Sequence, residues 1–278
     1  MINIQHLTFS YRRKEPLYSD LNLTLESGKI YGLLGKNGAG KTTLLKNIAS
    51  LLFPSSGSVS VNNYVPRERK PSFLQSIYFI PEQVYTPSLS AERYLDVYAP
   101  FYPQFDRTRF WQMLADFEVD KSLTINDLST GGQKKFIIAF ALACNTSVVV
   151  MDEPTNGLDI PSKSQFRKIM AAALTDDRLF IISTHQTRDL ENLIDQVVIL
   201  AEGSVLLNAP LSIINEKLSF ELVHNLPTTD DVLYSESSML GHAVVRRNRD
   251  GSDSKVSLEF LFNVMTTQPH ALKQIFNR

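Results

Sequence analysis

A glycine-rich segment near the N-terminus has the residue types needed to hold a chain of phosphates. It reads Gly35-Lys36-Asn37-Gly38-Ala39-Gly40-Lys41-Thr42: a glycine, four residues, then Gly-Lys-Thr. Glycines let the backbone curl so that several N–H groups point inward, and a helix that follows adds its positive end. Lys41 can then reach the β and γ phosphates, and Thr42 offers a hydroxyl to Mg²⁺. The phosphate-binding residues predicted here are Gly35, Lys36, Asn37, Gly38, Ala39, Gly40, Lys41, Thr42 and Thr43.

Two adjacent carboxylates follow an apolar run further along the chain. The run Val148–Met151 leads directly into Asp152 and Glu153. Ligand sites in open parallel sheets lie at the carboxyl ends of such strands. Asp152 can hold Mg²⁺ through its water shell, and Glu153 is placed to polarise an attacking water. Acidic residues also occur in solvated loops after strands, but the phosphate loop upstream favours the metal and water roles.

Between these motifs lies the segment Leu128-Ser129-Thr130-Gly131-Gly132-Gln133, followed by the basic pair Lys134 and Lys135. With this segment the chain resembles the ATP-binding subunit of ATP-binding cassette (ABC) transporters over about residues 1 to 218, and particularly the ATPases of bacterial two-component exporters. That family has a Leu-Ser-Gly-Gly-Gln signature before the strand carboxylate. A gap-free alignment puts Thr130 at the first signature glycine and Gly132 at the glutamine. Taken alone, Ser129 could equally be an ordinary helix cap before a glycine turn.

The resemblance implies roles for further residues. Tyr11 matches the aromatic that stacks on adenine, although a tyrosine at a strand end can also simply pack on the sheet. The segment Asn156–Asp159 resembles the loop through which one subunit of that family touches the active site of the other, although Gly157 and Asp159 could also be only a turn and a helix cap. His185 matches the switch histidine that contacts the γ phosphate. Nucleotide-binding positions outside the phosphate loop are thus Tyr11, Ser129, Thr130, Gly131, Gly132 and Asp159, and the catalytic residues are Lys41, Glu153 and His185.

One metal-binding position is ambiguous. The family has a switch glutamine after a stretch like Tyr78–Pro81, and here Glu82 and Gln83 both follow it. Strict alignment selects Glu82, while the amide side chain favours Gln83. The predicted metal ligands are therefore Thr42, Asp152 and either Gln83 or Glu82.

These residues need a strand, a loop and a helix to position them, and the apolar pattern predicts all three. Ile30–Leu34 is a short apolar strand before Gly35, and helical spacing follows from Leu44 to Leu52. Val148–Met151 and Leu179–Ile182 have the uniformly apolar pattern of parallel strands covered on both faces. The pattern predicts an α/β fold, and the resemblance implies a P-loop NTPase of the ABC ATPase type with a mixed sheet core.

The same pattern predicts two further parts. A mostly helical subdomain is expected over about residues 84–140, within an ABC nucleotide-binding domain at residues 1–218. Residues 219–278 are expected to form a small C-terminal α+β accessory region. Its expected strands lie around residues 232–234, 242–246 and 255–262, with a short helix beginning at Pro269.

Composition excludes several classes of protein. The chain has 278 residues, of which 28 are basic and 29 acidic, so no overall field attracts nucleic acid, and no nucleic-acid partner is expected. The single cysteine, Cys144, permits neither an intrachain disulfide nor a multi-cysteine zinc site. The longest apolar run, Phe136–Cys144, is shorter than the roughly 20 residues of a membrane helix. We therefore expect a cytoplasmic protein.

The predicted function is Mg²⁺-dependent hydrolysis of ATP coupled to transport. In the resembled family the signature serine faces the nucleotide of a partner, so one cassette per chain implies a homodimer of two copies bridged by two ATP. The absence of a membrane helix implies a separate permease, which would hold the protein at the inner face of the cell membrane. Export is favoured over import because the helical region resembles that of bacterial two-component exporters. An exposed aromatic patch there would suit a coupling helix, and the candidates are Tyr94, Tyr98, Phe101, Tyr102 and Phe105.

Two alternatives keep part of this prediction. The first is an ABC ATPase without a transport function, acting on ribosomes, nucleic acid or cofactor assembly. The second is a phosphate-loop kinase, which would account for Gly35–Thr42 but leaves Leu128–Gly132 and His185 without a role.

Overall fold

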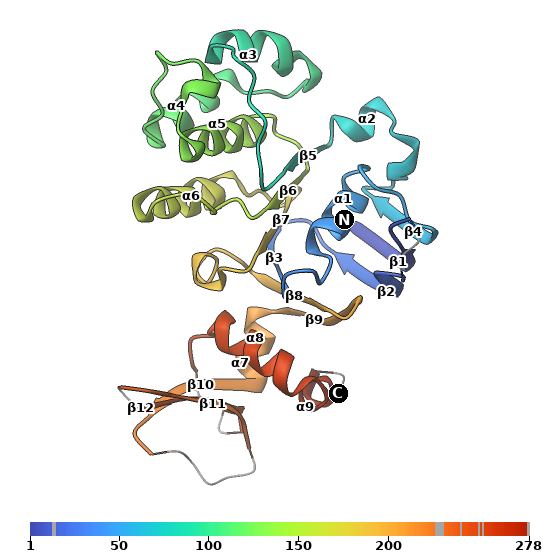
Figure 1. Cartoon of the computed structure of the whole chain (residues 1–278), viewed down its shortest axis with the longest axis vertical. Helices are drawn as coiled ribbons and strands as arrows, with labels where there is room; N and C mark the ends of the chain where they lie inside the picture. Colours follow the sequence, from blue (N-terminus) through green and yellow to red (C-terminus); the bar gives the residue numbers. More distant parts are fainter. Residues whose placement is uncertain (13–14, 226–230, 240, 250, 252, 277–278) are drawn as a thin grey trace.

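The core of the protein is a six-stranded mixed sheet. A computed structural model describes residues 1–12, 15–225, 231–239, 241–249, 251 and 253–276. The strand order is β5-β6-β7-β3-β8-β9, parallel from β5 to β8, with β9 antiparallel to β8 (Figure 1). The strands are β3 (Lys29–Leu34), β5 (Ile77–Ile80), β6 (Val148–Asp152), β7 (Leu179–Thr184), β8 (Gln196–Ala201) and β9 (Ser204–Pro210). The predicted α/β fold with a mixed sheet is confirmed.

The central strands are apolar throughout because both faces of the sheet are covered. Successive side chains of a strand point to opposite faces, and β6 accordingly divides its residues between two apolar cores. Val148 and Val150 join the core that contains helix α1 (Lys41–Ile48). Val149 and Met151 join the core that contains helix α6 (Ile160–Ala173). This burial fixes the strand ends, and hence the residues that follow them.

A second sheet covers the α1 side of the molecule. It is antiparallel, in the order β2-β1-β4, with β1 (Ile2–Phe9), β2 (Tyr18–Leu25) and β4 (Ser56–Val61) (Figure 1). The short η1 (Pro66–Glu68) and helix α2 (Pro71–Leu74) follow β4 and lead into β5. The sheet brings Tyr11, just beyond β1, to the side of the phosphate loop.

The predicted helical region is present, drawn in green in Figure 1. It contains α3 (Ala91–Tyr98), η2 (Ala99–Phe101), α4 (Arg107–Asp116), η3 (Ile125–Asp127) and α5 (Thr130–Ala143). Asp106 caps α4 by accepting a hydrogen bond from the Arg109 N–H, at 2.9 Å. Helix α5 ends at Cys144, which is only 2% exposed, and burial raises the pKa of its thiol.

The aromatic residues of this region are mostly internal, which corrects the expectation of an exposed aromatic set. Tyr94, Tyr102 and Phe105 all pack their rings against Phe140 of α5, at centroid distances of 5.0, 6.2 and 5.1 Å. Tyr94 belongs to α3, and Tyr102 and Phe105 lie between η2 and α4. These rings therefore fill the space between α5 and that part of the helical region. Of the predicted aromatic residues, Phe101 is 64% exposed and Tyr98 is 37% exposed.

In its described residues, the C-terminal part contains a three-stranded antiparallel sheet, with one helix before the sheet and two after it. The sheet order is β10-β12-β11, with β10 (Leu218–Val223), β11 (Val232–Ser238) and β12 (Gly241–Arg247). The predicted strands around 232–234 and 242–246 are confirmed, and so is a helix from Pro269, α9 (Pro269–Phe276). Helix α7 (Leu211–Lys217) precedes the sheet. Residues 226–230, 240, 250, 252 and 277–278 of the predicted accessory region lie outside the described residues.

The predicted strand at 255–262 is wrong, because this segment begins helix α8 (Leu258–Thr267). Ser257 caps the helix by accepting a hydrogen bond from the Phe260 N–H. Leu258, Leu261 and Val264 then fall on one face at helical spacing and are buried. The local alternation of apolar and polar residues suggested a strand, whereas the cap and this longer stripe determine a helix.

Helix α8 packs against the part of the chain that precedes residue 218. Leu258 and Leu261 belong to the same apolar core as Leu190 and Ile194, which follow the short η4 (Thr187–Asp189). Glu259 forms an ion pair of 2.9 Å with Arg188 of η4. The apolar core is therefore continuous across residue 218. No helix in the described part of the chain is long and apolar enough to cross a membrane.

Candidate functional site

The phosphate loop has a backbone conformation that requires glycine at several positions. Gly38 and Gly40 have φ angles of +83° and +102°, in the left-handed region. A Cβ on Gly40 would collide with the side chain of Tyr18, and a Cβ on Gly35 would lie 2.6 Å from the Leu200 carbonyl oxygen. Helix α1 begins immediately afterwards, with Gly40 as its N-cap. The positive end of α1 and the curled backbone thus face the same space, which suits an anion.

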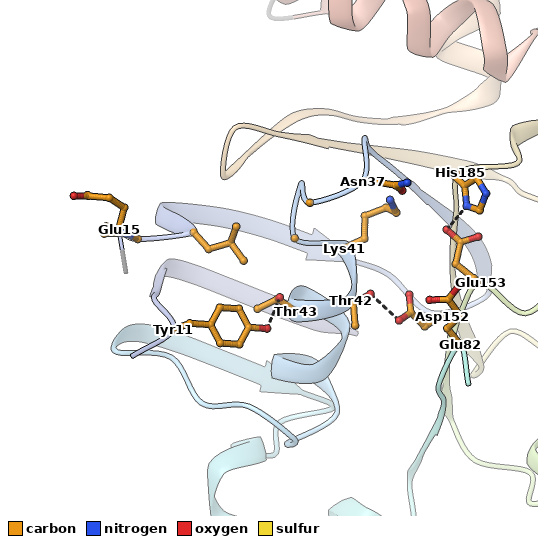
Figure 2. Close-up of a pocket in the computed structure, with 14 residues that line it drawn as sticks. Tyr11, Glu15, Asn37, Lys41, Thr42, Thr43, Glu82, Asp152, Glu153 and His185 are labelled. Atoms are coloured by element: carbon orange, nitrogen blue, oxygen red, sulfur yellow. Dashed lines mark hydrogen bonds and ion pairs between the residues drawn. The ribbon is translucent and has the colours of Figure 1, made fainter. Parts of the chain in front are cut away.

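That space is a pocket of about 620 Å³ between the loop and the ends of β6 and β7 (Figure 2). Many predicted site residues line it: Tyr11, Asn37, Gly38, Gly40, Lys41, Thr42, Thr43, Glu82, Asp152, Glu153 and His185. Glu15, Pro16 and Leu17 also line it and had no predicted role. The pocket therefore brings together residues from five separate segments of the chain.

Lys41 lies along the loop, with its amino group at the floor of the pocket. Its Nζ donates a hydrogen bond of 2.7 Å to the Gly35 carbonyl oxygen. Burial lowers the pKa of Lys41, while the carboxylates of Glu153, Asp152 and Glu82 raise it. The carbonyl partner keeps the ammonium in place for an incoming phosphate.

Oxygen atoms gather beside this lysine. Thr42 Oγ1 donates to one oxygen of Asp152 at 2.7 Å, and Ser183 Oγ donates to the other at 2.5 Å. Sequence reasoning missed Ser183, whose register partner in the sheet is Asp152 itself. The feature of the sequence that could have identified Ser183 is a hydroxyl residue near the end of an otherwise apolar strand.

This oxygen set fits Mg²⁺. A hydroxyl and carboxylates are hard donors of the kind that Mg²⁺ prefers, and the ion usually keeps waters and takes phosphate oxygens. Among the described residues, no group of three or more His, Cys, Asp and Glu side chains is arranged to hold a metal alone. Thr42 and Asp152 would supply part of the oxygen shell of Mg²⁺, and waters and phosphate oxygens would supply the rest. Glu82 lines the pocket, whereas Gln83 is absent from its lining, and the choice between them as a metal ligand stays a prediction.

Glu153 has an unusual backbone that aims its carboxylate. Its φ angle is +48°, a strained conformation for a residue with a side chain, and it is 6% exposed. Oε1 lies 2.8 Å from His185 Nδ1, and this contact is drawn as a dashed line in Figure 2. Oε2 is buried and accepts no hydrogen bond from the described residues. One oxygen thus has a partner in His185, and the other has none among the described residues.

Tyr11 lies at the far end of the pocket from His185 (Figure 2). Its hydroxyl is 2.9 Å from Thr43 Oγ1, and its ring meets Phe9 edge to face at 5.0 Å. The side chain is 44% exposed. An exposed ring tied to the phosphate loop has the position that a stacking aromatic needs.

The signature residues and Asp159 lie outside this pocket. Ser129 caps α5 by accepting a hydrogen bond of 3.1 Å from the Gly132 N–H, and Asp159 caps α6 in the same way through Ser162. Both caps are exposed. A Cβ on Gly131 would lie 3.0 Å from the Gly157 carbonyl oxygen, so the two predicted partner-facing segments touch each other. Predicted positions absent from the lining of the pocket are Gly35, Lys36, Ala39, Gln83, Ser129, Thr130, Gly131, Gly132 and Asp159.

Comparison with known proteins identifies this arrangement. A family model described as ABC transporter matches residues 18–156. The chain belongs to the ABC transporter family. It is 30% identical over 205 residues to the ABC transporter ATP-binding protein NatA of Bacillus subtilis (strain 168), covering 71% of this chain and 83% of NatA. It is 28% identical over 207 residues to YtrB of the same strain, covering 74% of this chain and 70% of YtrB.

The fold agrees with a solved member of the family. The structure of the ATP binding subunit of an ABC transporter superposes with a TM-score of 0.70 at 26% identity, covering 77% of this chain and 92% of that chain. The resemblance drawn from the motifs is thus confirmed, as are the ABC ATPase fold and the enzyme class. This ABC ATPase carries its phosphate loop and strand carboxylates on the elements that the family model spans.

Proposed function

We propose that this ABC ATPase is the ATP-hydrolysing subunit of a transporter whose membrane permease is a separate chain. One observation carries the proposal. The phosphate loop, the Thr42–Asp152 pair and the Glu153–His185 pair surround one pocket, while the exposed signature segment lies outside it. This separation supports a site that is shared between two copies of the chain.

The residues of the pocket divide the chemistry among them. Loop N–H groups and Lys41 bind the phosphates and stabilise the charge that develops during transfer. The free Oε2 of Glu153 orients a water molecule and accepts its proton, while His185 holds Oε1. Mg²⁺, when bound, neutralises phosphate charge. Thr42, Asp152 and Glu82 would hold it.

The second copy of the chain supplies the missing half of each site. Ser129 and Asp159 are exposed and lie outside the pocket of their own chain. In a homodimer, each signature segment, with Ser129, Thr130, Gly131 and Gly132, would close the other copy's nucleotide site. ATP then favours the closed dimer, and hydrolysis favours the open one, so phosphate loss becomes a rigid-body movement.

The movement would be passed to a permease through the helical region. Phe101 is 64% exposed, Val97 is 42% exposed and Tyr98 is 37% exposed, and all three lie on α3 and η2. Exposed apolar side chains at neighbouring positions suit a protein contact. The direction of transport that we propose is export, and the permease would hold the protein at the inner face of the membrane.

The proposal is tested with the permease encoded beside this chain in its genome. The purified full chain should copurify with that permease in detergent, and its ATPase rate should rise when the two are reconstituted. A chain that neither copurifies nor gains activity contradicts the transporter assignment. Salt-sensitive binding to RNA or DNA under the same conditions would instead support the alternative without transport.

A further inference from the structure

A lysine is buried beneath the loop that follows the catalytic carboxylate. Lys134 lies in the second turn of α5 and is 3% exposed. Its Nζ donates hydrogen bonds of 3.0 Å to the Glu153 carbonyl oxygen and 2.9 Å to the Asn156 carbonyl oxygen. None of the described acidic side chains forms an ion pair with it. In the sequence, this residue stands out only as one of two adjacent lysines.

Packing alone does not account for an ammonium at this position. Further along α5, Phe136, Ile137 and Ile138 are apolar and fill the core. Taking a charge out of water is costly unless partners compensate it. Burial lowers the pKa of Lys134, and the carboxylates of Glu82, Glu153 and Asp152 oppose that effect. What distinguishes Lys134 from its apolar neighbours is the pair of carbonyl groups that it binds.

Those two carbonyl groups mark the two ends of one turn. The Asn156 N–H donates to the Glu153 carbonyl oxygen at 3.3 Å, which closes the turn from Glu153 to Asn156. Glu153 has its strained φ angle of +48° at the start of this turn. Lys134 therefore holds the backbone that aims the Glu153 carboxylate.

The far end of the turn contacts the rest of the site. The Asn156 side chain donates to Glu82 Oε1 at 3.3 Å and accepts from Gln186 Nε2 at 3.2 Å. Gln186 directly follows His185. The turn thus connects the loops that carry Glu82 and His185, and Lys134 joins it to the helix that Ser129 begins.

We propose that Lys134 is a positioning residue that clamps both ends of the Glu153–Asn156 turn and so couples the signature helix α5 to the catalytic carboxylate of its own chain. This role rests on the proposed function, in which Ser129 serves the partner copy. A displacement of the start of α5 by the partner's nucleotide then reaches Glu153 through one side chain.

The test uses the neighbouring lysine as a matched control. Lys135 lies on the same helix, and its Nζ donates to the Phe117 carbonyl oxygen at 3.2 Å, away from the turn. In the full-length protein, Lys134→Met should lower kcat for ATP by about 10-fold to 100-fold, since small displacements of catalytic groups have effects of this size. The KM for ATP should stay within about threefold, because the phosphate loop is unchanged. Lys135→Met should keep both values within about twofold of wild type.

A conservative variant and an exchange measurement complete the experiment. Lys134→Arg should recover part of kcat, because a guanidinium can donate to both carbonyl groups. Without nucleotide, amide hydrogen exchange at Asn156 and Leu158 should be faster in Lys134→Met and unchanged in Lys135→Met. If Lys134→Met does not fold, Lys134→Gln is measured in its place, with the same expected directions.

The outcomes separate this inference from the proposed function. An unchanged kcat or unchanged exchange in the Lys134 variants overturns the clamp, as does a parallel loss of kcat and nucleotide affinity. A wild-type chain without ATP turnover contradicts the proposed function. The exchange measurement needs no turnover, so it still decides whether Lys134 holds the turn.

Discussion

At the scale of single residues, Glu153 is set apart by its two carboxylate oxygens. His185 Nδ1 lies 2.8 Å from one, and the other is buried without a partner among the described residues. Glu153→Gln keeps the size and the contact with His185 but removes the base. We expect ATP binding to persist and turnover to fall by about 10² to 10⁴. Steady-state hydrolysis and nucleotide binding measure the two effects.

The same variant also tests the dimer. Because hydrolysis would open it, Glu153→Gln should accumulate an ATP-bridged dimer on size-exclusion chromatography with Mg²⁺. The wild-type protein with ADP is the control and should elute as the smaller species. A variant that hydrolyses ATP at the wild-type rate would remove Glu153 from its assigned role.

Gly40 and Gly38 allow a second comparison at this scale. Both have positive φ angles, so an alanine at either position is strained by about 1–2 kcal/mol. Gly40→Ala adds a collision with Tyr18, whereas nothing lies within 4 Å of a Cβ on Gly38. We expect Gly40→Ala to lower both the melting temperature and nucleotide affinity more than Gly38→Ala. Equal effects would show that the Tyr18 contact does not shape the loop.

Site residues can be predicted from the sequence where the residue type and its immediate neighbours determine the role. The phosphate loop, Asp152 and Glu153 have types and neighbours that admit few other roles, and the structure gathers them at one pocket. Ser183 and Lys134 act through contacts with residues far along the chain, Asp152 and Asn156 respectively. A local pattern can mark such a residue, as the end of an apolar strand marks Ser183, but it does not identify the distant partner. Those contacts depend on strand register and helix placement.

At the scale of elements, α8 shows where periodicity misleads. The expected strand at 255–262 rests on a few alternating residues, but the helix is determined by the Ser257 cap and by burial against η4. The strands of the cassette were easier to predict because coverage on both faces makes them uniformly apolar.

Helix α8 is also the place to measure how firmly the C-terminal part is attached. Leu261 is fully buried in the core shared with Leu190. Leu261→Ala should lower the free energy of unfolding by about 2–5 kcal/mol, as expected for an internal cavity. Thermal melts read this directly. A change near zero would mean that α8 contributes little to the shared core.

At the scale of the whole molecule, the division at residue 218 remains a prediction, with a nucleotide-binding part before it and an accessory part after it. The continuous apolar core argues that the two parts unfold together. We expect one thermal transition for the full chain, shifted upward by ATP, with about 2.7 kcal/mol gained at a hundredfold excess over Kd. Two separate transitions, only one of them sensitive to ATP, would show instead that the parts are independent.

The burial of Cys144 has a practical consequence for studies of motion. The chain has no other cysteine, and this thiol is 2% exposed with a raised pKa, so it reacts poorly with maleimides and similar reagents. The natural protein is therefore already a suitable background for site-directed fluorophores or spin labels. A probe attached near the signature segment would report the approach of two subunits in real time, without any prior removal of native thiols.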